Sequence, residues 1–180
     1  MKWYLDFGHG GKDPGAVGKN GTKESDVVLK IGLCVKDLLE KVNETVVTTR
    51  TSDTYLTLSY RTNKANKENC DYFISFHMNS FTNLAKGCEV WVYNSNSKLY
   101  LLGNNIVFNL SKALNTPNRG IKTSKSFYVL KHTKMPALLI EIDFISNPVV
   151  ESVCFSDAYI KTTAYTIAST LLAFVNKKLY

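Results

Sequence analysis

The sequence has no apolar run long enough to cross a bilayer, and its four cysteines form no C-x-x-C pair. The longest apolar stretch, residues 164–175, is shorter than the roughly 20 residues that a membrane-spanning helix needs. No basic segment followed by an apolar run opens the chain, so the pattern of a signal peptide is missing. We therefore expect a soluble chain made in the cytoplasm, without membrane insertion. Scattered cysteines indicate reduced core thiols rather than a disulfide framework or a thiolate zinc site; they are Cys34, Cys70, Cys88 and Cys154.

Proline and glycine are also scarce, at 4 and 10 of 180 residues, which argues against disorder. With 44% hydrophobic residues and no repeat, low-complexity tract or linker, residues 1–180 are expected to form one domain with its own core. The net charge of +7 favours an acidic partner: nucleic acid, anionic lipid or a polyanionic cell wall. Basic and aromatic residues do not interleave as they do on nucleic-acid surfaces, so a nucleic-acid partner is not expected.

Short runs rich in β-branched and aromatic residues alternate with helical patterns along the chain. This alternation predicts an α/β fold, with a twisted, mostly parallel six-stranded sheet and helices on both faces. Strands are expected at residues 2–7, 43–50, 71–77, 87–93, 126–130 and 137–144. Helices are expected at residues 24–42, 57–68, 99–113 and 164–175.

A glycine-rich loop, "GHGGKDPG", follows the first expected strand. It does not match a dinucleotide fingerprint, because Asp13 stands at the third glycine position and the next helical pattern begins only near Glu24. It is not a Walker loop either, since Asp13 follows Gly11-Lys12 where serine or threonine is required. The loop is therefore either a plain connection or a site built at the end of a strand.

Two of the three histidines end strands, His9 after the first and His77 at the end of "DYFISFH". The carboxyl ends of parallel strands share one edge, so both imidazoles can converge there. Glu24, in the first turn of the next helix, can either join them or simply stabilise the helix dipole. Two imidazoles and one carboxylate form a catalytic zinc set, which leaves the fourth position open for water.

Glu141 interrupts the apolar strand "ALLIEIDF" near its carboxyl end, on the edge where the histidines are expected. A carboxylate within a covered strand must be paired, bound to metal or exposed at the strand end. An acid beside an activated water can take its proton and hand it to a leaving amine. Glu141 is therefore the candidate general base and acid of an amide hydrolase.

These motifs, in this order, resemble the zinc-dependent N-acetylmuramoyl-L-alanine amidases of bacterial cell-wall hydrolases and phage endolysins, the amidase type 3 family. The resemblance runs through "DFGHGGKDPGA", "KESDVVLKI", "TRTSDTYLTLSYRTNKAN", "DYFISFHMNS", "GCEVWVY", "NRGIK" and "FYVLKHTKMPALLIEIDFISN". By position it implies one Zn²⁺ on His9, Glu24 and His77, with Glu141 as the catalytic glutamate. It also implies cleavage of the amide between the lactyl group of N-acetylmuramic acid and L-alanine.

Two positions depart from the family pattern. Phe7 precedes the Gly-His pair where a small residue or proline is common, and Asp143 replaces the usual glycine after the catalytic glutamate. Asp143 either acts on the substrate side, beside Glu141, or points to the other face of the sheet if the strand is irregular. We expect the substrate side.

Further polar residues have a binding and a structural interpretation. Asn79 either binds substrate or orients a metal ligand. Arg119, with Lys122 and Lys125, forms a basic loop that either meets stem-peptide carboxylates or is simply solvated. His132 follows an expected strand and is assigned to an exposed loop rather than to the cleft.

The sequence thus predicts a zinc amidase that degrades peptidoglycan. The alternatives are another zinc amide hydrolase of the same fold and a catalytically inactive wall-binding module. Peptidoglycan is the expected partner, with anionic wall polymers attracted by the net charge. The chain is expected to reach the wall after release by holin-type pores or lysis, and a longer native chain is expected to carry a C-terminal wall-binding domain.

Overall fold

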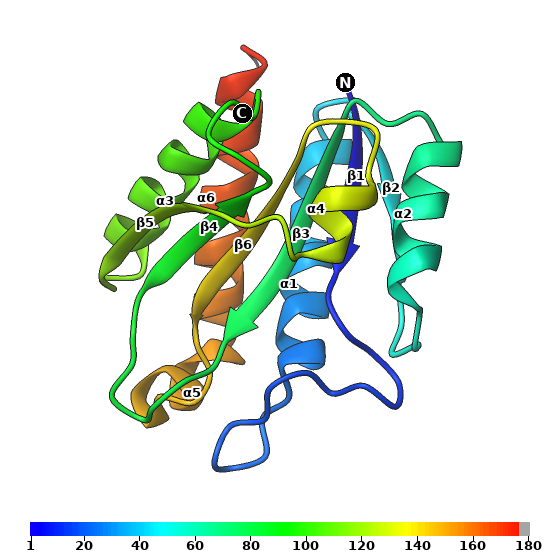
Figure 1. The fold of residues 1–180 in the computed structure, drawn as a ribbon. Helices are drawn as coiled ribbons and strands as arrows, with labels where there is room; N and C mark the ends of the chain where they lie inside the picture. Colours follow the sequence, from blue (N-terminus) through cyan, green and yellow to red (C-terminus); the bar gives the residue numbers. More distant parts are fainter. Residues whose placement is uncertain (177–180) are drawn as a thin grey trace.

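Residues 1–176 are described by the structure, a computed structural model, and within them six strands form one sheet in the order β2-β1-β3-β6-β4-β5 (Figure 1). The last four residues of the expected domain lie outside the described residues. Strands β2, β1, β3 and β6 are parallel, whereas β4 runs antiparallel to β6 and parallel to β5. The predicted mostly parallel sheet is confirmed. The strands are β1 (Lys2–Phe7), β2 (Thr45–Thr48), β3 (Tyr72–Asn79), β4 (Cys88–Val92), β5 (Asn118–Thr123) and β6 (Ala137–Phe144).

Helices cover both faces of this sheet, as predicted. Figure 1 shows α2 and α4 in front of it and α1, α3 and α6 behind it. The helices are α1 (Glu24–Glu40), α2 (Leu58–Lys67), α3 (Tyr100–Ala113), α4 (Tyr128–His132), α5 (Pro148–Cys154) and α6 (Asp157–Phe174). None of the helices described combines the length and the apolar character needed to span a membrane.

The central strands bury side chains on both faces, which explains their nearly continuous apolar sequences. In β1, Trp3, Leu5 and Phe7 join the larger core with α1, α3 and α6. Tyr4, between them, joins the smaller core against α2 and α4. Asp6 therefore also lies on the α2 and α4 side, and the chain continues from there into the glycine-rich loop.

The prediction for residues 118–130 was wrong in two places. Residues 126–130, expected as a strand, include the first three residues of α4, whose Val129 and Leu130 are buried in the smaller core. The missing strand is β5, whose sequence NRGIKT carries Arg119 and Lys122 and was interpreted as a basic loop. A short apolar run does not separate strand from helix, and an edge strand that is mostly solvated carries no apolar signal.

All four cysteines are free thiols; Cys70, Cys88 and Cys154 are buried in the core as predicted, whereas Cys34 is only half-buried. Asn147 caps α5, since its Oδ1 accepts hydrogen bonds from the backbone N–H groups of Val149 and Val150. This turn places α5 beneath the carboxyl end of β6 (Figure 1).

Candidate active site

His9 leaves the end of β1 in a left-handed conformation, with φ of +58°. This conformation costs a residue other than glycine about 1–3 kcal/mol, so contacts with surrounding residues must stabilise the backbone at His9. Arg61, which is buried, donates hydrogen bonds to the carbonyl oxygens of His9 and Phe7 at 2.8 and 2.7 Å. Buried Arg50 donates to the carbonyl oxygens of Gly8 and Ser25 at 2.9 and 2.7 Å, which ties the loop to the start of α1.

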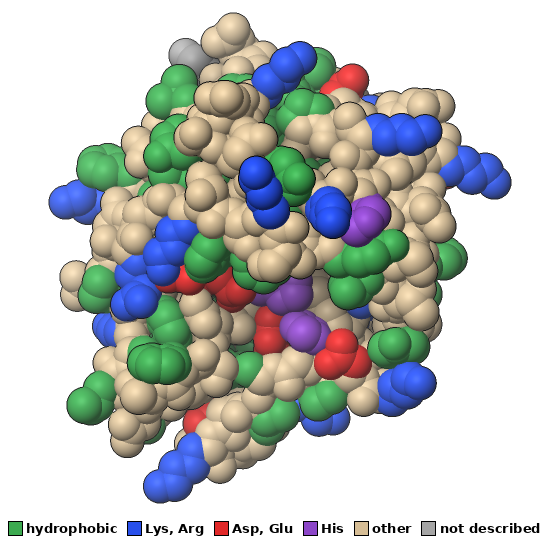
Figure 2. Space-filling model, viewed as in Figure 1, with side chains coloured by type: hydrophobic (Ala, Val, Ile, Leu, Met, Phe, Trp, Pro, Cys, Tyr) green, Lys and Arg blue, Asp and Glu red, His purple; other side chains and the backbone are tan. Residues whose placement is uncertain are grey.

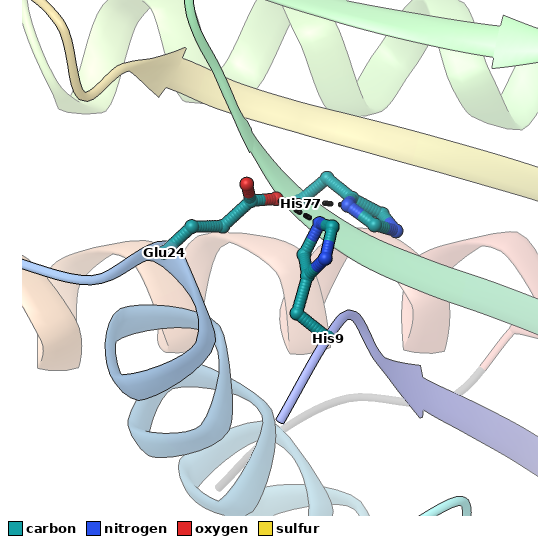
Figure 3. A group of neighbouring side chains, drawn as sticks. All are labelled: His9, Glu24 and His77. Carbon is teal, nitrogen blue, oxygen red and sulfur yellow. Dashed lines mark hydrogen bonds and ion pairs between the residues drawn. The ribbon is translucent and has the colours of Figure 1, made fainter. Parts of the chain in front are cut away.

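Three side chains from three elements converge at this point (Figure 3). The Glu24 Oε1 atom lies 3.2 Å from His9 Nε2 and 2.8 Å from His77 Nδ1. Glu24 opens α1, His9 follows β1, and His77 lies near the end of β3. The sequence prediction that these residues share one edge of the sheet is therefore confirmed in the geometry.

Glycines make room for this convergence. A Cβ on Gly15, whose φ is +67°, would meet Glu24 Oε2 and His9 Cδ2 at 2.6 Å. A Cβ on Gly8 would meet the His77 ring at 2.4 Å. The glycine content of the loop thus follows from the close approach of backbone to the site residues, as well as from the need to turn.

The donor atoms fit a zinc ion. One ligand atom from each of the three residues lies within 4.8 Å of the others, and tetrahedral zinc with bonds near 2.0–2.1 Å needs ligand atoms about 3.3 Å apart. Asp13 Oδ2 lies 2.9 Å from His9 Nδ1, an arrangement that keeps the Nε2 lone pair directed at the site. Glu24 Oε2 accepts a hydrogen bond from the Ala16 backbone N–H at 2.9 Å, which fixes the carboxylate.

Charges around the cluster suit a cation. Burial alone would raise the pKa of Glu24, but His77 and His9 hold that pKa far below its ordinary value. Burial lowers the pKa of His9, yet the carboxylates of Glu24 and Asp13 outweigh this effect and raise it. The cluster therefore holds an ionised carboxylate between two imidazoles, with its side chain only 4% exposed.

Glu141 stands beside His77, because the two residues are register partners on the parallel strands β6 and β3. Its Oε2 is buried and has no hydrogen-bond partner among residues 1–176. Burial, together with the negative charges of Glu24 and Glu89, raises the pKa of Glu141 well above its ordinary value. A buried acceptor without a partner costs about 1–3 kcal/mol, so an arriving donor would gain at this atom.

A cavity of about 320 Å³ opens next to the cluster. His9, His77 and Glu141 line one side of it, and α2, α4 and the segments before them form the other side. The lining on that second side is largely apolar and aromatic: Tyr55, Leu56, Leu58, Phe127, Tyr128 and Val129. The histidines and the candidate acid therefore share one solvent-accessible space.

Asn79 and Arg119 meet at a residue that the sequence interpretation missed. Asn79 Nδ2 and Arg119 Nε both donate to the carboxylate of Glu89, at 3.0 and 2.9 Å. Glu89 is the register partner of Glu141 on the antiparallel strand β4. The substrate-binding roles of Asn79 and Arg119 stay predictions. A signal for Glu89 was present, since it interrupts the apolar strand "GCEVWVY" as Glu141 interrupts its own.

The substrate-side expectation for Asp143 was wrong. The register between β3 and β6 shifts after His77 and Glu141, so the alternation of faces is broken before Asp143. Asp143 is 1% exposed, and its carboxylate accepts hydrogen bonds from Gly87 N–H and Thr116 Oγ1, at 2.7 and 2.6 Å. Asp143 therefore connects β6 to the residues just before β4 and β5, and it does not face the substrate side.

His132 ends α4 and is exposed, with its ring stacked on that of Tyr128 at 3.9 Å. Its Nδ1 lies 2.9 Å from the Tyr128 carbonyl oxygen. It does not line the cavity beside the cluster. The expected place outside the cleft is confirmed, although His132 lies in a helix and not in a loop.

Comparisons with known proteins agree with this geometry. The family described as N-acetylmuramoyl-L-alanine amidase matches residues 4–173. The chain is 38% identical to the sporulation-specific N-acetylmuramoyl-L-alanine amidase of Bacillus subtilis (strain 168), over 82% of this chain and 57% of that protein. It is 36% identical to the endolysin of Bacillus phage SPP1, over 97% of this chain and 66% of that protein. The chain thus spans less than two thirds of the length of either relative.

A solved structure is similar over almost its whole length. The crystal structure of N-acetylmuramoyl-L-alanine amidase from Clostridium difficile 630 has a TM-score of 0.92 and 31% identity, over 98% of this chain and 97% of that chain. The expected bounds of residues 1–180 stay a prediction, since the family match ends at residue 173. With its matched sequence and its shared fold, the chain belongs to the N-acetylmuramoyl-L-alanine amidase family.

Proposed function

We propose that this chain is a zinc-dependent amidase that hydrolyses the bond between the lactyl group of N-acetylmuramic acid and L-alanine in peptidoglycan. The observation that carries the proposal is that His9 and His77, which cluster with Glu24, line one cavity together with Glu141. Membership of the family supports the substrate, since its description names this amide.

His9 Nε2, Glu24 Oε1 and His77 Nδ1 are the atoms that would hold the zinc ion. When bound, zinc lowers the pKa of water, polarises a carbonyl and stabilises the oxyanion that develops on it. Asp13 keeps His9 in the required tautomer, and Arg61 and Arg50 keep the strained loop in place. These residues orient the site and leave one side of it open to the cavity.

Glu141 supplies the proton transfer in this proposal. Its carboxylate takes a proton from the attacking water, whose oxygen forms the new bond to the amide carbon. It then gives a proton to the amide nitrogen as the C–N bond breaks, which releases a lactyl carboxylate and the amino group of L-alanine. A general base works best when its pKa lies near the working pH, and the environment of Glu141 shifts its pKa in that direction.

The proposal extends to partners and location. Peptidoglycan is the substrate, and the net charge of +7 favours attraction to anionic wall polymers. We propose that the chain meets the wall after release from the cell in which it is made.

The test is the release of stem peptides from purified cell walls by the zinc-loaded protein. We expect removal of zinc with a chelator to abolish release, and added zinc to restore it. Glu141→Gln is expected to lose about 10²–10⁴-fold in kcat while its zinc content stays unchanged. Release that survives both changes would refute the mechanism, and mass spectrometry of the products would show whether a different amide is cleaved.

A further inference from the structure

Two cations meet on one buried carboxylate next to the proposed active site. Glu89 Oε2 lies 2.9 Å from Arg119 Nε and 2.6 Å from Lys122 Nζ. The Glu89 side chain is 3% exposed, whereas those of Arg119 and Lys122 are 40% and 34% exposed. Because two cations share a single carboxylate, an excess of positive charge faces solvent here.

The other carboxylate oxygen of Glu89 also has two side-chain partners. Oε1 accepts hydrogen bonds from Asn79 Nδ2 at 3.0 Å and from Trp91 Nε1 at 3.1 Å. Burial alone would raise the pKa of Glu89, but the bonds from Lys122 and Arg119 outweigh burial and lower it. The Glu89 carboxylate therefore stays ionised, and it holds the side chains of Arg119 and Lys122 in place.

The two cationic side chains are also fixed along their stems. Arg119 Cζ lies 4.9 Å from the centre of the Phe144 ring. The absent side chain of Gly87 leaves room for Arg119, whose Cγ and Cδ lie 2.8 and 2.9 Å from the place of a Cβ there. Lys122 Nζ lies 5.2 Å from the centre of the Trp91 ring. Neither Nη atom of Arg119 has a protein partner within residues 1–176, so these donors are available to a ligand.

The cation pair lies at a defined distance from the proposed catalytic acid. Glu89 is the register partner of Glu141, and Lys122 lies on β5, one strand farther out. Neighbouring strands are about 4.8 Å apart, and the charged ends of both cations bind Glu89, so they lie about 5–10 Å across the sheet from Glu141. Figure 2 shows acidic and histidine side chains gathered in a row across this face of the molecule, with basic side chains at one end of the row.

The opposite flank of the site has different chemistry. The cavity there is lined by aromatic and aliphatic side chains, among them Tyr55, Phe127 and Tyr128, from the α2 and α4 side. The two flanks therefore favour different parts of a substrate that crosses the site. The two cations over β4 and β5 favour an anionic group, whereas the aromatic rings on the other side favour contact with a sugar ring.

We propose that Arg119 and Lys122, oriented by Glu89, bind a carboxylate of the stem peptide on the amine side of the scissile amide. This inference rests on the proposed function, and it fixes the direction in which the substrate lies. An extended peptide advances about 3.5 Å per residue, so a carboxylate two or three residues beyond the scissile bond reaches the cations. The guanidinium fork suits a carboxylate, and Lys122 adds a point charge.

The test compares two soluble muramoyl peptides that differ only in one group: a free carboxylate on the second stem residue, or its carboxamide. For the wild-type protein we expect kcat/KM to be about tenfold higher with the carboxylate. Arg119→Gln and Lys122→Met are expected to bring this ratio close to one, and Arg119→Lys to restore it in part. Lys125→Met is the matched control, since Lys125 is exposed and lies outside the cluster. An equal ratio in the wild type and in the cluster variants would overturn the proposal.

A binding measurement separates this inference from the proposed function. Calorimetry with the free stem peptide and its carboxamide form requires no hydrolysis. In one outcome the protein binds the carboxylate form selectively, Arg119→Gln loses this selectivity, and neither muramoyl peptide is hydrolysed. This outcome supports the anion site and refutes the amidase. Hydrolysis of both peptides without any selectivity in binding or rate refutes the anion site and leaves the amidase standing.

Discussion

His77 and Glu141 lie side by side as register partners on the neighbouring parallel strands β3 and β6. One contributes an imidazole to the candidate metal cluster, and the other presents a buried oxygen without a hydrogen-bond partner in the described chain. Because the sheet itself sets their separation, loop movement does not change it. The separation between the candidate metal ligand His77 and the candidate proton carrier Glu141 is thus set by the pairing of two central strands.

His9→Asn is expected to separate metal binding from folding. Asparagine tolerates the left-handed conformation that His9 adopts at φ of +58° better than most residues, so the loop keeps its shape. The variant loses one of three ligands, and we expect its zinc affinity to fall by more than about 100-fold. Titration with zinc, followed by metal analysis of the dialysed protein, measures this loss.

Thermal unfolding provides the control for His9→Asn. Without zinc, the variant and the wild type should unfold within about 1–2 kcal/mol of each other. With zinc in excess, only the wild type should gain stability, by about 2.7 kcal/mol at 100 times the dissociation constant. An equal gain in both proteins would show that the metal binds elsewhere.

Gly15→Ala should damage the site by contact rather than by backbone strain. A Cβ at Gly15 meets both Glu24 and His9 at 2.6 Å. Gly21→Ala is the matched control, because Gly21 also has a positive φ, of +89°, but nothing lies within 4 Å of its Cβ position. Both variants should lose about 1–2 kcal/mol of stability. Only Gly15→Ala is expected to weaken zinc binding, by about 10–100-fold; equal zinc affinities would contradict the steric argument.

The position of the cluster was predictable because it depends on two simple rules. Parallel strands end at one edge, which brought together His9 and His77, and an acidic residue in an apolar strand marked Glu141. The contribution of Asp13 was not predicted, since a carboxylate four residues beyond His9 meets its ring only after the loop closes through the Gly10 and Asp13 backbone bridge.

The errors in the prediction also have physical causes. Strand β5 lies at the sheet edge and is mostly solvated, so its sequence lacks the apolar pattern that marked the central strands. The register shift beyond His77 cannot be read from the sequence, and it breaks the alternation from which the face of Asp143 was predicted. Both features, the strand β5 and the face of Asp143, depend on how strands pair with one another. The residues of a single strand do not determine them.

Acid should unfold the protein partly through Asp6. Burial would raise the pKa of Asp6, but Arg61, Thr49 and Ser75 lower it below its ordinary value of 3.8. A carboxylate whose folded pKa is lowered stabilises the fold above its unfolded pKa, and this stability is lost as the pH falls through the folded pKa. We therefore expect the free energy of unfolding to fall steadily below about pH 4.

Asp6→Asn checks the origin of this acid loss. The variant leaves Arg61 without its buried partner, so it should lose about 3–5 kcal/mol at neutral pH. Its stability should then depend less on pH below 4 than that of the wild type. Urea unfolding at several pH values measures both effects, and an unchanged slope in the variant would assign the acid loss to other carboxylates.

Phe7 and Gly32 should prove to be energetically coupled. The ring of Phe7 on β1 occupies the space of a Cβ on Gly32 of α1, at 2.1 Å. Gly32→Ala should therefore cost about 1–3 kcal/mol by overpacking, even though alanine favours helix. In a Phe7→Leu background the same substitution should be nearly neutral, since the smaller side chain vacates that space. A double-mutant cycle by urea unfolding measures the coupling, and a cost that is equal in both backgrounds would disprove the contact.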